Sequence, residues 1–151
     1  MANTQAMCTS FKGELLVGHH NFGTGVTRGS TAADTFKAAL YLASATVNAA
    51  TTAYSATNEV SGTGYTAGGV TVTFGTAPST SGTTAFVTPS ASITYSAVTL
   101  STAFDAVLIY NSTQSNKAVS VHTFGSQTVT AGTFTLTMPV NDASTGLIRL
   151  A

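Results

Sequence analysis

The 151-residue chain is predicted to be all-β: a single antiparallel β-sandwich of jelly-roll or Ig-like type, with a short N-terminal helix or arm. Three observations predict this fold. Short runs of alternating apolar and polar residues recur between turns rich in Gly, Pro, Ser and Asn. Thirty threonines favour strands, because a side chain branched at Cβ fits a pleated surface better than a helix. A second long helical pattern is missing, which favours a sandwich over a mixed fold.

Two regions are expected along the chain. Residues 1–34 are predicted to form a helix or arm followed by a loop, and residues 35–151 the sandwich domain. Ser10 is a suitable cap for a helix over residues 10–17. The apolar residues that share one face of this helix are Phe11, Leu15 and Leu16.

The predicted strands follow one another at short intervals. Their ranges are 36–42, 69–74, 84–88, 92–100, 104–110, 117–124, 134–138 and 146–150. Most alternate apolar with polar residues, as a strand does when one of its faces is buried. The stretches 76–84 and 111–116 are rich in Thr, Ser, Gly and Asn, so they are expected to connect neighbouring strands.

A long loop is expected between the first two predicted strands, over residues 43–69. It consists mainly of Ala, Thr, Ser and Gly. Within residues 35–72 only Lys37 and Glu59 carry a charge. Because a loop of this length inside a compact domain is usually functional or held from outside, we expect it to lie along a neighbouring molecule.

The charge content narrows the possible partners. Five Lys and Arg balance five Asp and Glu, and only 7% of residues are charged, against about 25% in an average soluble protein. Nucleic acid is not expected as a partner, because its binding depends on positive charge that releases counterions. Self-association or a protein partner is expected instead, since little charge repels one copy from another.

No membrane span and no disulfide are expected. No apolar run approaches the roughly 20 residues that a helix needs to cross a bilayer. Cys8 is the only cysteine, so the chain cannot form an internal disulfide. The N-terminus does not resemble a signal peptide, which favours synthesis in a cytoplasm.

The sequence predicts a protein that is not an enzyme and that holds no metal or cofactor. His19 and His20 are adjacent, so their side chains are expected to point in different directions, and His122 is far away. The five carboxylates are Glu14, Asp34, Glu59, Asp105 and Asp142, and no two are close in sequence. A convergent pair for sugar hydrolysis is therefore disfavoured. Asp105 is expected to face outward or to lie at a strand edge.

Aromatic residues suggest a contact surface. The chain has five tyrosines and eight phenylalanines, most of them at strand positions that predict a core. Tyr54 and Tyr65 fall in the long loop and are expected at a partner interface. An alternative is that these two rings stack on sugars.

Several stretches resemble a small structural protein that recurs in tailed bacteriophages, and they occur in the same order. They are Phe11-Lys12, His20-Asn21-Phe22, 36–41 (FKAALY), 53–60 (AYSATNEV), 62–69 (GTGYTAGG), 106–111 (AVLIYN), 116–119 (NKAV) and 130–135 (TAGTFT). The resemblance covers nearly the whole chain. It departs from the family at 104–107 (FDAV), where the family tends to have an Arg-Gly-like pair.

The resemblance implies a virion structural protein, a capsid decoration or cement protein that stabilises the head shell by binding between major capsid protein subunits. It would associate into dimers or trimers and lie on the capsid surface after assembly in the host bacterial cytoplasm. The alternative is a tail or fibre-associated receptor-binding module. The residues expected at the partner interface are Phe11, His20, Phe22, Tyr54, Asn58, Glu59 and Tyr65.

Overall fold

A computed structural model describes residues 3–8, 10, 11, 15, 19, 20, 22, 23 and 33–150. Its elements are all strands: β1 (Ala6–Met7), β2 (Phe36–Leu42), β3 (Val70–Val72), β4 (Ser79–Ser81), β5 (Thr84–Val87), β6 (Ile93–Asn111), β7 (Lys117–Leu136) and β8 (Ile148–Leu150). The prediction of an all-β fold is therefore confirmed. Most of the helix predicted over residues 10–17 lies outside the described residues.

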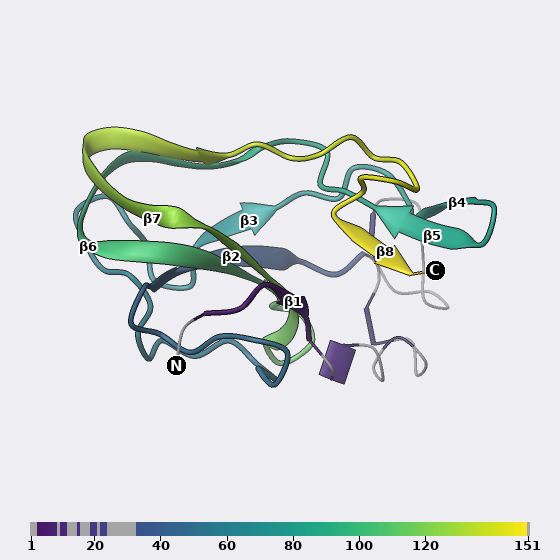
Figure 1. Cartoon of the computed structure of the whole chain (residues 1–151), viewed down its shortest axis with the longest axis horizontal. Coiled ribbons are helices and arrows are strands. Elements are labelled where there is room, and N and C mark those ends of the chain that lie inside the picture. Colours follow the sequence, from purple (N-terminus) through teal and green to yellow (C-terminus); the bar gives the residue numbers. More distant parts are fainter. Residues whose placement is uncertain are drawn as a thin grey trace.

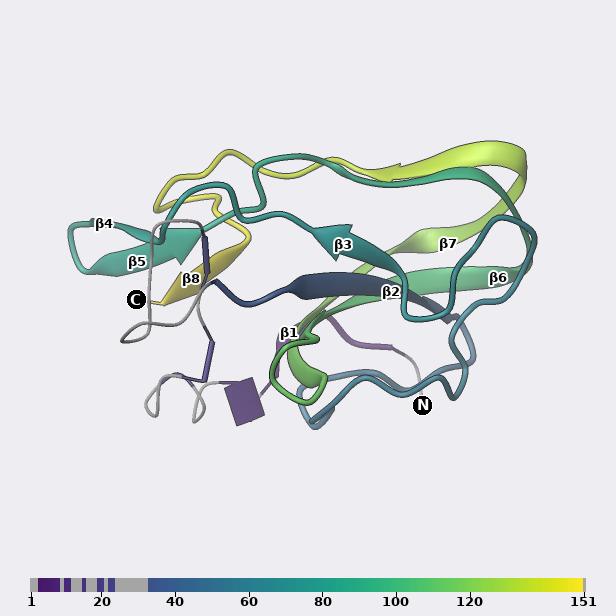
Figure 2. The same ribbon diagram turned by 180° about the vertical axis from the view of Figure 1, so that it is seen from behind.

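The strands form two antiparallel sheets, an arrangement compatible with a β-sandwich (Figure 1). The larger sheet has the order β1-β7-β6-β2-β3, and the smaller one the order β4-β5-β8. Figure 2, the view from behind, shows the small sheet at one end of the molecule and the long β6–β7 hairpin at the other. The β4–β5 turn begins with Gly82 at a φ of 57°, as a two-residue hairpin turn of type II′ requires.

Four of the predicted strands are present with nearly the expected bounds: β2, β3, β5 and β8. The structure adds β1 and β4, which the sequence did not predict. These strands have only two and three residues, too few for an alternating pattern to stand out.

The prediction of separate strands at 92–100 and 104–110, and again at 117–124 and 134–138, was wrong. Each pair is one continuous strand, β6 of 19 residues and β7 of 20 residues. The Ser, Thr and Gly residues between the two predicted segments of each pair resemble turn sequences. In the structure they belong to β6 and β7, which pair with each other in an irregular register here. The β6–β7 register shifts repeatedly between Tyr95 and Ala106, and Ala97 and Ala131 have positive φ.

These irregularities bend the hairpin back on itself. Phe124 and Phe134 both lie on β7, ten positions apart, which would separate them by about 33 Å along a straight strand. Their ring centroids are only 5.2 Å apart. Phe104 of β6 contacts both rings, at 5.9 and 5.0 Å. The far half of the hairpin therefore lies over the near half, and a core forms between them.

Asp105 does not lie at a strand edge, which was one of the two positions expected for it. It belongs to β6, a central strand of the large sheet, and it is half-buried. The side-chain amide of Asn3 donates a hydrogen bond to its carboxylate at 2.5 Å. The same amide group donates to the carbonyl of Leu42 and accepts from the backbone N–H of Val47. The N-terminal arm is thus joined both to β6 and to the start of the long loop.

Candidate functional site

The long loop, residues 43–69, is fixed to the large sheet along its length. Isolated bridges join Ala53 to Lys117, Glu59 to Tyr41 and Thr63 to Thr99. Backbone hydrogen bonds of 2.9–3.1 Å accompany them, such as Leu42 N–H to the carbonyl of Asn58 and Ala118 N–H to that of Thr52. The loop therefore crosses from the β7 side of the sheet to the far half of β6 in one defined path.

Glu59 is the centre of a hydrogen-bond cluster that fastens this loop. Its side chain is only 8% exposed. The hydroxyl of Tyr54 donates to one carboxylate oxygen, and the hydroxyl of Tyr65 donates to the other, each at 2.7 Å. The backbone N–H of Gly68 donates to the second oxygen at 2.8 Å. The carboxylate thus gathers three donors from the loop, which compensates for its removal from water.

All five tyrosines of the chain surround this carboxylate: Tyr41, Tyr54, Tyr65, Tyr95 and Tyr110. Tyr95 donates to the carbonyl of Ala38, and Tyr110 donates to that of Gly68. Burial raises the pKa of Tyr41 to about 12, and the charge of Glu59 adds to this effect. Burial and Glu59 likewise raise the pKa of the other four tyrosines. We call this group the tyrosine cluster.

The loop tyrosines are packed against the sheet, whereas the sequence suggested an open loop. The ring of Tyr54 stacks on Tyr110 at 4.7 Å, and the ring of Tyr65 stacks on Tyr95 at 5.9 Å. Both side chains are half-buried, and their hydroxyls point inward to Glu59. One face of each ring is therefore covered, which leaves only the opposite face for stacking on a sugar.

The outward side of the loop is uncharged and composed of small residues. Its exposed residues between positions 52 and 67 are Thr52, Ala53, Ser55, Ala56, Thr57, Asn58, Ser61, Gly62, Thr63, Gly64, Thr66 and Ala67. Asn58, one of the expected interface residues, has a φ of 60° at a turn in this surface. Because the tyrosine cluster holds the loop in place, these exposed residues form a fixed, moderately polar surface. We call this set of exposed residues the loop surface.

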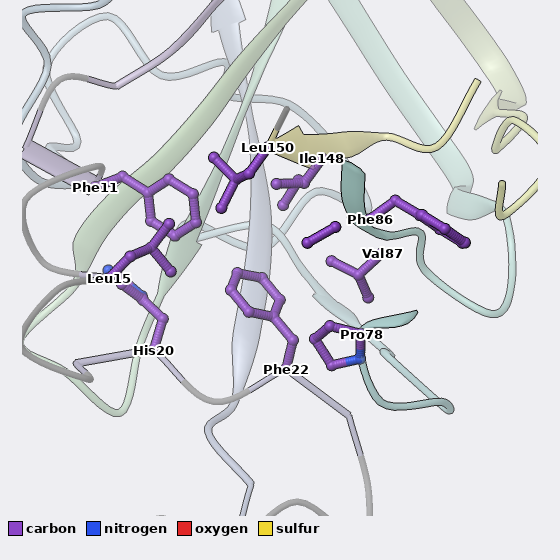
Figure 3. A pocket seen from close by; sticks show the side chains of 10 residues that line it. Phe11, Leu15, His20, Phe22, Pro78, Phe86, Val87, Ile148 and Leu150 are labelled. Carbon is purple, nitrogen blue, oxygen red and sulfur yellow. The ribbon is translucent and has the colours of Figure 1, made fainter. Parts of the chain in front are cut away.

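A second candidate site is an apolar pocket of about 210 Å³ at the other end of the molecule (Figure 3). Phe11, His20 and Phe22 form one wall, and strands β5 and β8 form the other. The residues that line it are Phe11, Leu15, His20, Phe22, Pro78, Ala85, Phe86, Val87, Ile148 and Leu150. We call it the aromatic pocket.

His20 is held at the aromatic pocket by Asn111, which is fully buried at the end of β6. The side-chain nitrogen of Asn111 lies 3.1 Å from Nδ1 of His20 and donates to Asp34 at 2.7 Å. The His20 ring also packs against Phe11, with centroids 4.7 Å apart. These contacts make His20 part of a rigid wall.

The seven expected interface residues thus fall into two groups. Tyr54, Glu59 and Tyr65 form the tyrosine cluster with Asn58 beside it, whereas Phe11, His20 and Phe22 line the aromatic pocket. Sequence reasoning did not place β5 and β8 opposite the N-terminal aromatics. The consecutive apolar residues of the predicted strands 84–88 and 146–150 indicate a buried environment for Val87 and Ile148, but they do not indicate which segment covers them.

Within the described part of the chain, no three His, Cys, Asp or Glu side chains are grouped as a metal site would require. No helix of the described residues is long and apolar enough to cross a membrane. Comparison of the chain with protein-family models, curated proteins and solved structures finds no match.

Proposed function

We propose that this protein is a structural component of a tailed-bacteriophage virion, a decoration protein that binds the capsid shell between major capsid protein subunits. The observation that carries the proposal is the loop surface, a broad uncharged surface held in one conformation by Glu59. The resemblance of several segments to a recurrent phage structural protein gives the class of particle. No catalytic chemistry is part of this function.

A fixed surface favours binding because less conformational entropy is lost when it docks. Exposed Thr, Ser, Asn and Ala residues suit the moderately polar interfaces formed by proteins that fold before they assemble. The formal net charge of zero leaves little repulsion between copies, which supports association into dimers or trimers on the shell. A protein that binds only the mature shell would stabilise that shell by mass action.

Protein quantification of purified virions tests the location. Hundreds of copies per particle are expected for a capsid protein, in a fixed ratio to the major capsid protein. A copy number of about three to twelve, typical of a symmetric tail structure, would instead favour a receptor-binding tail module. Absence from the particle would rule out both.

Reconstitution tests the loop surface itself. Heads stripped of this protein should become heat-sensitive and should regain resistance when the purified protein is added back. Thr57→Arg, in the centre of the loop surface, should weaken rebinding by about tenfold, because a large charged group is placed in an uncharged contact. Thr128→Arg, at an exposed position of β7, is the matched control. Stripped heads that are as heat-resistant as intact heads would contradict the cement role.

A further inference from the structure

The aromatic pocket has the size of a site for one side chain. Its volume is about 210 Å³, whereas pockets for whole cofactors or drug-sized ligands span roughly 300–1,000 Å³. An apolar cavity of about 150 Å³ in another protein is known to hold a benzene molecule. The aromatic pocket therefore fits one ring with its first carbon atoms, and it is too small for a cofactor.

The walls of the pocket favour an aromatic occupant. Phe11 and Phe22 meet edge to face, at 5.8 Å and 84°, and Phe22 stacks on Phe36 at 4.6 Å. Phe22 also meets Phe74 edge to face at 4.9 Å. An added ring would extend this cluster through the same edge-to-face contacts, each worth about 0.5–1.5 kcal/mol beyond area burial.

The pocket also favours an uncharged occupant. Among the described residues that line it, none is an acid, a lysine or an arginine. The nearest arginine in sequence, Arg149, lies between the lining residues Ile148 and Leu150, so its side chain is on the opposite face of β8. Its guanidinium donates to the carbonyls of Ala143 and Ser144, which holds it on that face.

A second copy of this chain has no suitable aromatic group. All thirteen aromatic residues, eight Phe and five Tyr, are described, and each is buried or half-buried. The exposed large hydrophobic side chains of the described residues are Val140 and Leu150, both aliphatic. None of the aromatic rings projects fully from the surface, which favours an aromatic occupant from a different protein over a ring of a second copy.

We propose that the aromatic pocket receives one aromatic side chain of the capsid shell protein. The identity of that partner rests on the proposed function, whereas the ring-binding property rests on the pocket alone. The inserted ring would be the buried anchor of the contact, because aromatic groups that fill pockets contribute much of the binding energy at interfaces. The loop surface would supply the broader polar contact around it.

A simple ring tests the pocket without any partner. Toluene, which has the ring and first carbon of phenylalanine, should shift the methyl NMR signals of Val87, Ile148 and Leu150 in a saturable way. Ala85→Phe places a ring inside the pocket from β5 and should abolish these shifts. If Ala85→Phe lowers the melting temperature through overpacking, the smaller Ala85→Leu replaces it. Toluene shifts that persist with the pocket filled, or that are absent from the wild type, would overturn the proposal.

Stripped heads test the partner. The variant with the filled pocket should bind heads at least about tenfold more weakly than the wild type. Thr83→Phe is the matched control, since it adds the same ring two residues away at an exposed position of the β4–β5 turn, and it should bind normally. Normal binding of Ala85→Phe would overturn the pocket inference and leave the proposed function intact. Failure of the wild type to bind heads would count against the proposed function, and toluene would still decide whether the pocket binds rings.

Sedimentation tests whether a second copy of this chain, and not the shell protein, fills the pocket. The wild type and Ala85→Phe are expected to have the same oligomeric state, because a second copy offers no aromatic group among its exposed residues. A dimer that Ala85→Phe dissociates would show that another copy fills the pocket, which would overturn the assignment to the shell protein.

Discussion

Tyr54 and Tyr65 stand eleven positions apart in the long loop, yet their hydroxyls donate to the two oxygens of the same carboxylate, each at 2.7 Å. That carboxylate belongs to Glu59, which lies between them in sequence. The loop is therefore held by hydrogen bonds between its own residues as well as by contacts with the sheet. The hydrogen bonds to Glu59 thus hold the long loop in one conformation, although the loop has few large apolar residues and contains no helix and no named strand.

Removal of the Glu59 carboxylate should loosen the loop and destabilise the fold. Glu59→Ala leaves three donors without their acceptor, so we expect a loss of about 3–5 kcal/mol in the free energy of unfolding. Glu59→Gln keeps one acceptor oxygen and should lose less. Urea unfolding measures both values, and hydrogen exchange in residues 43–69 should rise in Glu59→Ala. A Glu59→Ala protein as stable as the wild type would contradict the role of this carboxylate.

The tyrosine cluster should make the protein sensitive to alkali. Each tyrosine has a pKa above 10 in the folded state, about 12 for Tyr41, against 10 in the unfolded chain. The folded state therefore holds these protons more tightly, and this stabilisation is complete below pH 10. It is lost as pH rises above 10 toward the folded-state pKa.

Unfolding in urea between pH 8 and pH 12 checks this dependence. Tyr65→Phe should be less stable than the wild type at pH 8, because it loses a hydrogen bond to Glu59, but its stability should decline less steeply above pH 10. Equal slopes for the two proteins would show that Tyr65 does not contribute to the alkaline transition.

His122 should give the opposite dependence in acid. Burial lowers the pKa of His122 to about 4, from 6.5. The neutral ring is the form that the fold accepts, and its Nε2 lies 2.9 Å from the hydroxyl of Ser120. Because the folded-state pKa is lower, stability is complete above pH 6.5 and falls by on the order of 3 kcal/mol as pH drops toward 4. His122→Gln should reduce this decline in urea titrations at pH 4–7, and an unchanged decline would assign the acid sensitivity to other groups.

The positions of most strands were predictable from the sequence, whereas the two candidate sites were not. The bounds of β2 follow from a local pattern of buried residues, and Phe36–Leu42 is found as predicted. The bend of β7 depends on contacts such as that between Phe124 and Phe134, which a local pattern does not contain. The tyrosine cluster gathers residues from β2, β6 and the loop, and only Glu59, as the sole charge in the loop, gave a signal of it.

The bent hairpin should depend on Phe134. Its ring contacts Phe104, Phe124 and Tyr95, so it joins the two halves of the hairpin. Phe134→Ala should lower the free energy of unfolding by about 3 kcal/mol, since a half-buried ring leaves a cavity that closes in part. Thr135→Ala, at the next and exposed position, should change it by less than about 0.5 kcal/mol. Similar values for the two variants would show that the bend does not depend on this aromatic contact.

Alanine variants of two glycines with positive φ should distinguish the cost of backbone strain from the cost of close packing. Gly69 has a φ of 73°, and a Cβ there would overlap the carbonyl oxygen of Ala38 in β2. Gly82 has a φ of 57° in the β4–β5 turn, with open space around a Cβ. Gly82→Ala should therefore lower the free energy of unfolding by only about 1–2 kcal/mol, the cost of a left-handed backbone conformation for a residue with a Cβ. Gly69→Ala should lose clearly more in urea unfolding, because β3 must move away from β2, and losses of equal size would mean that the two strands already leave room for a methyl group.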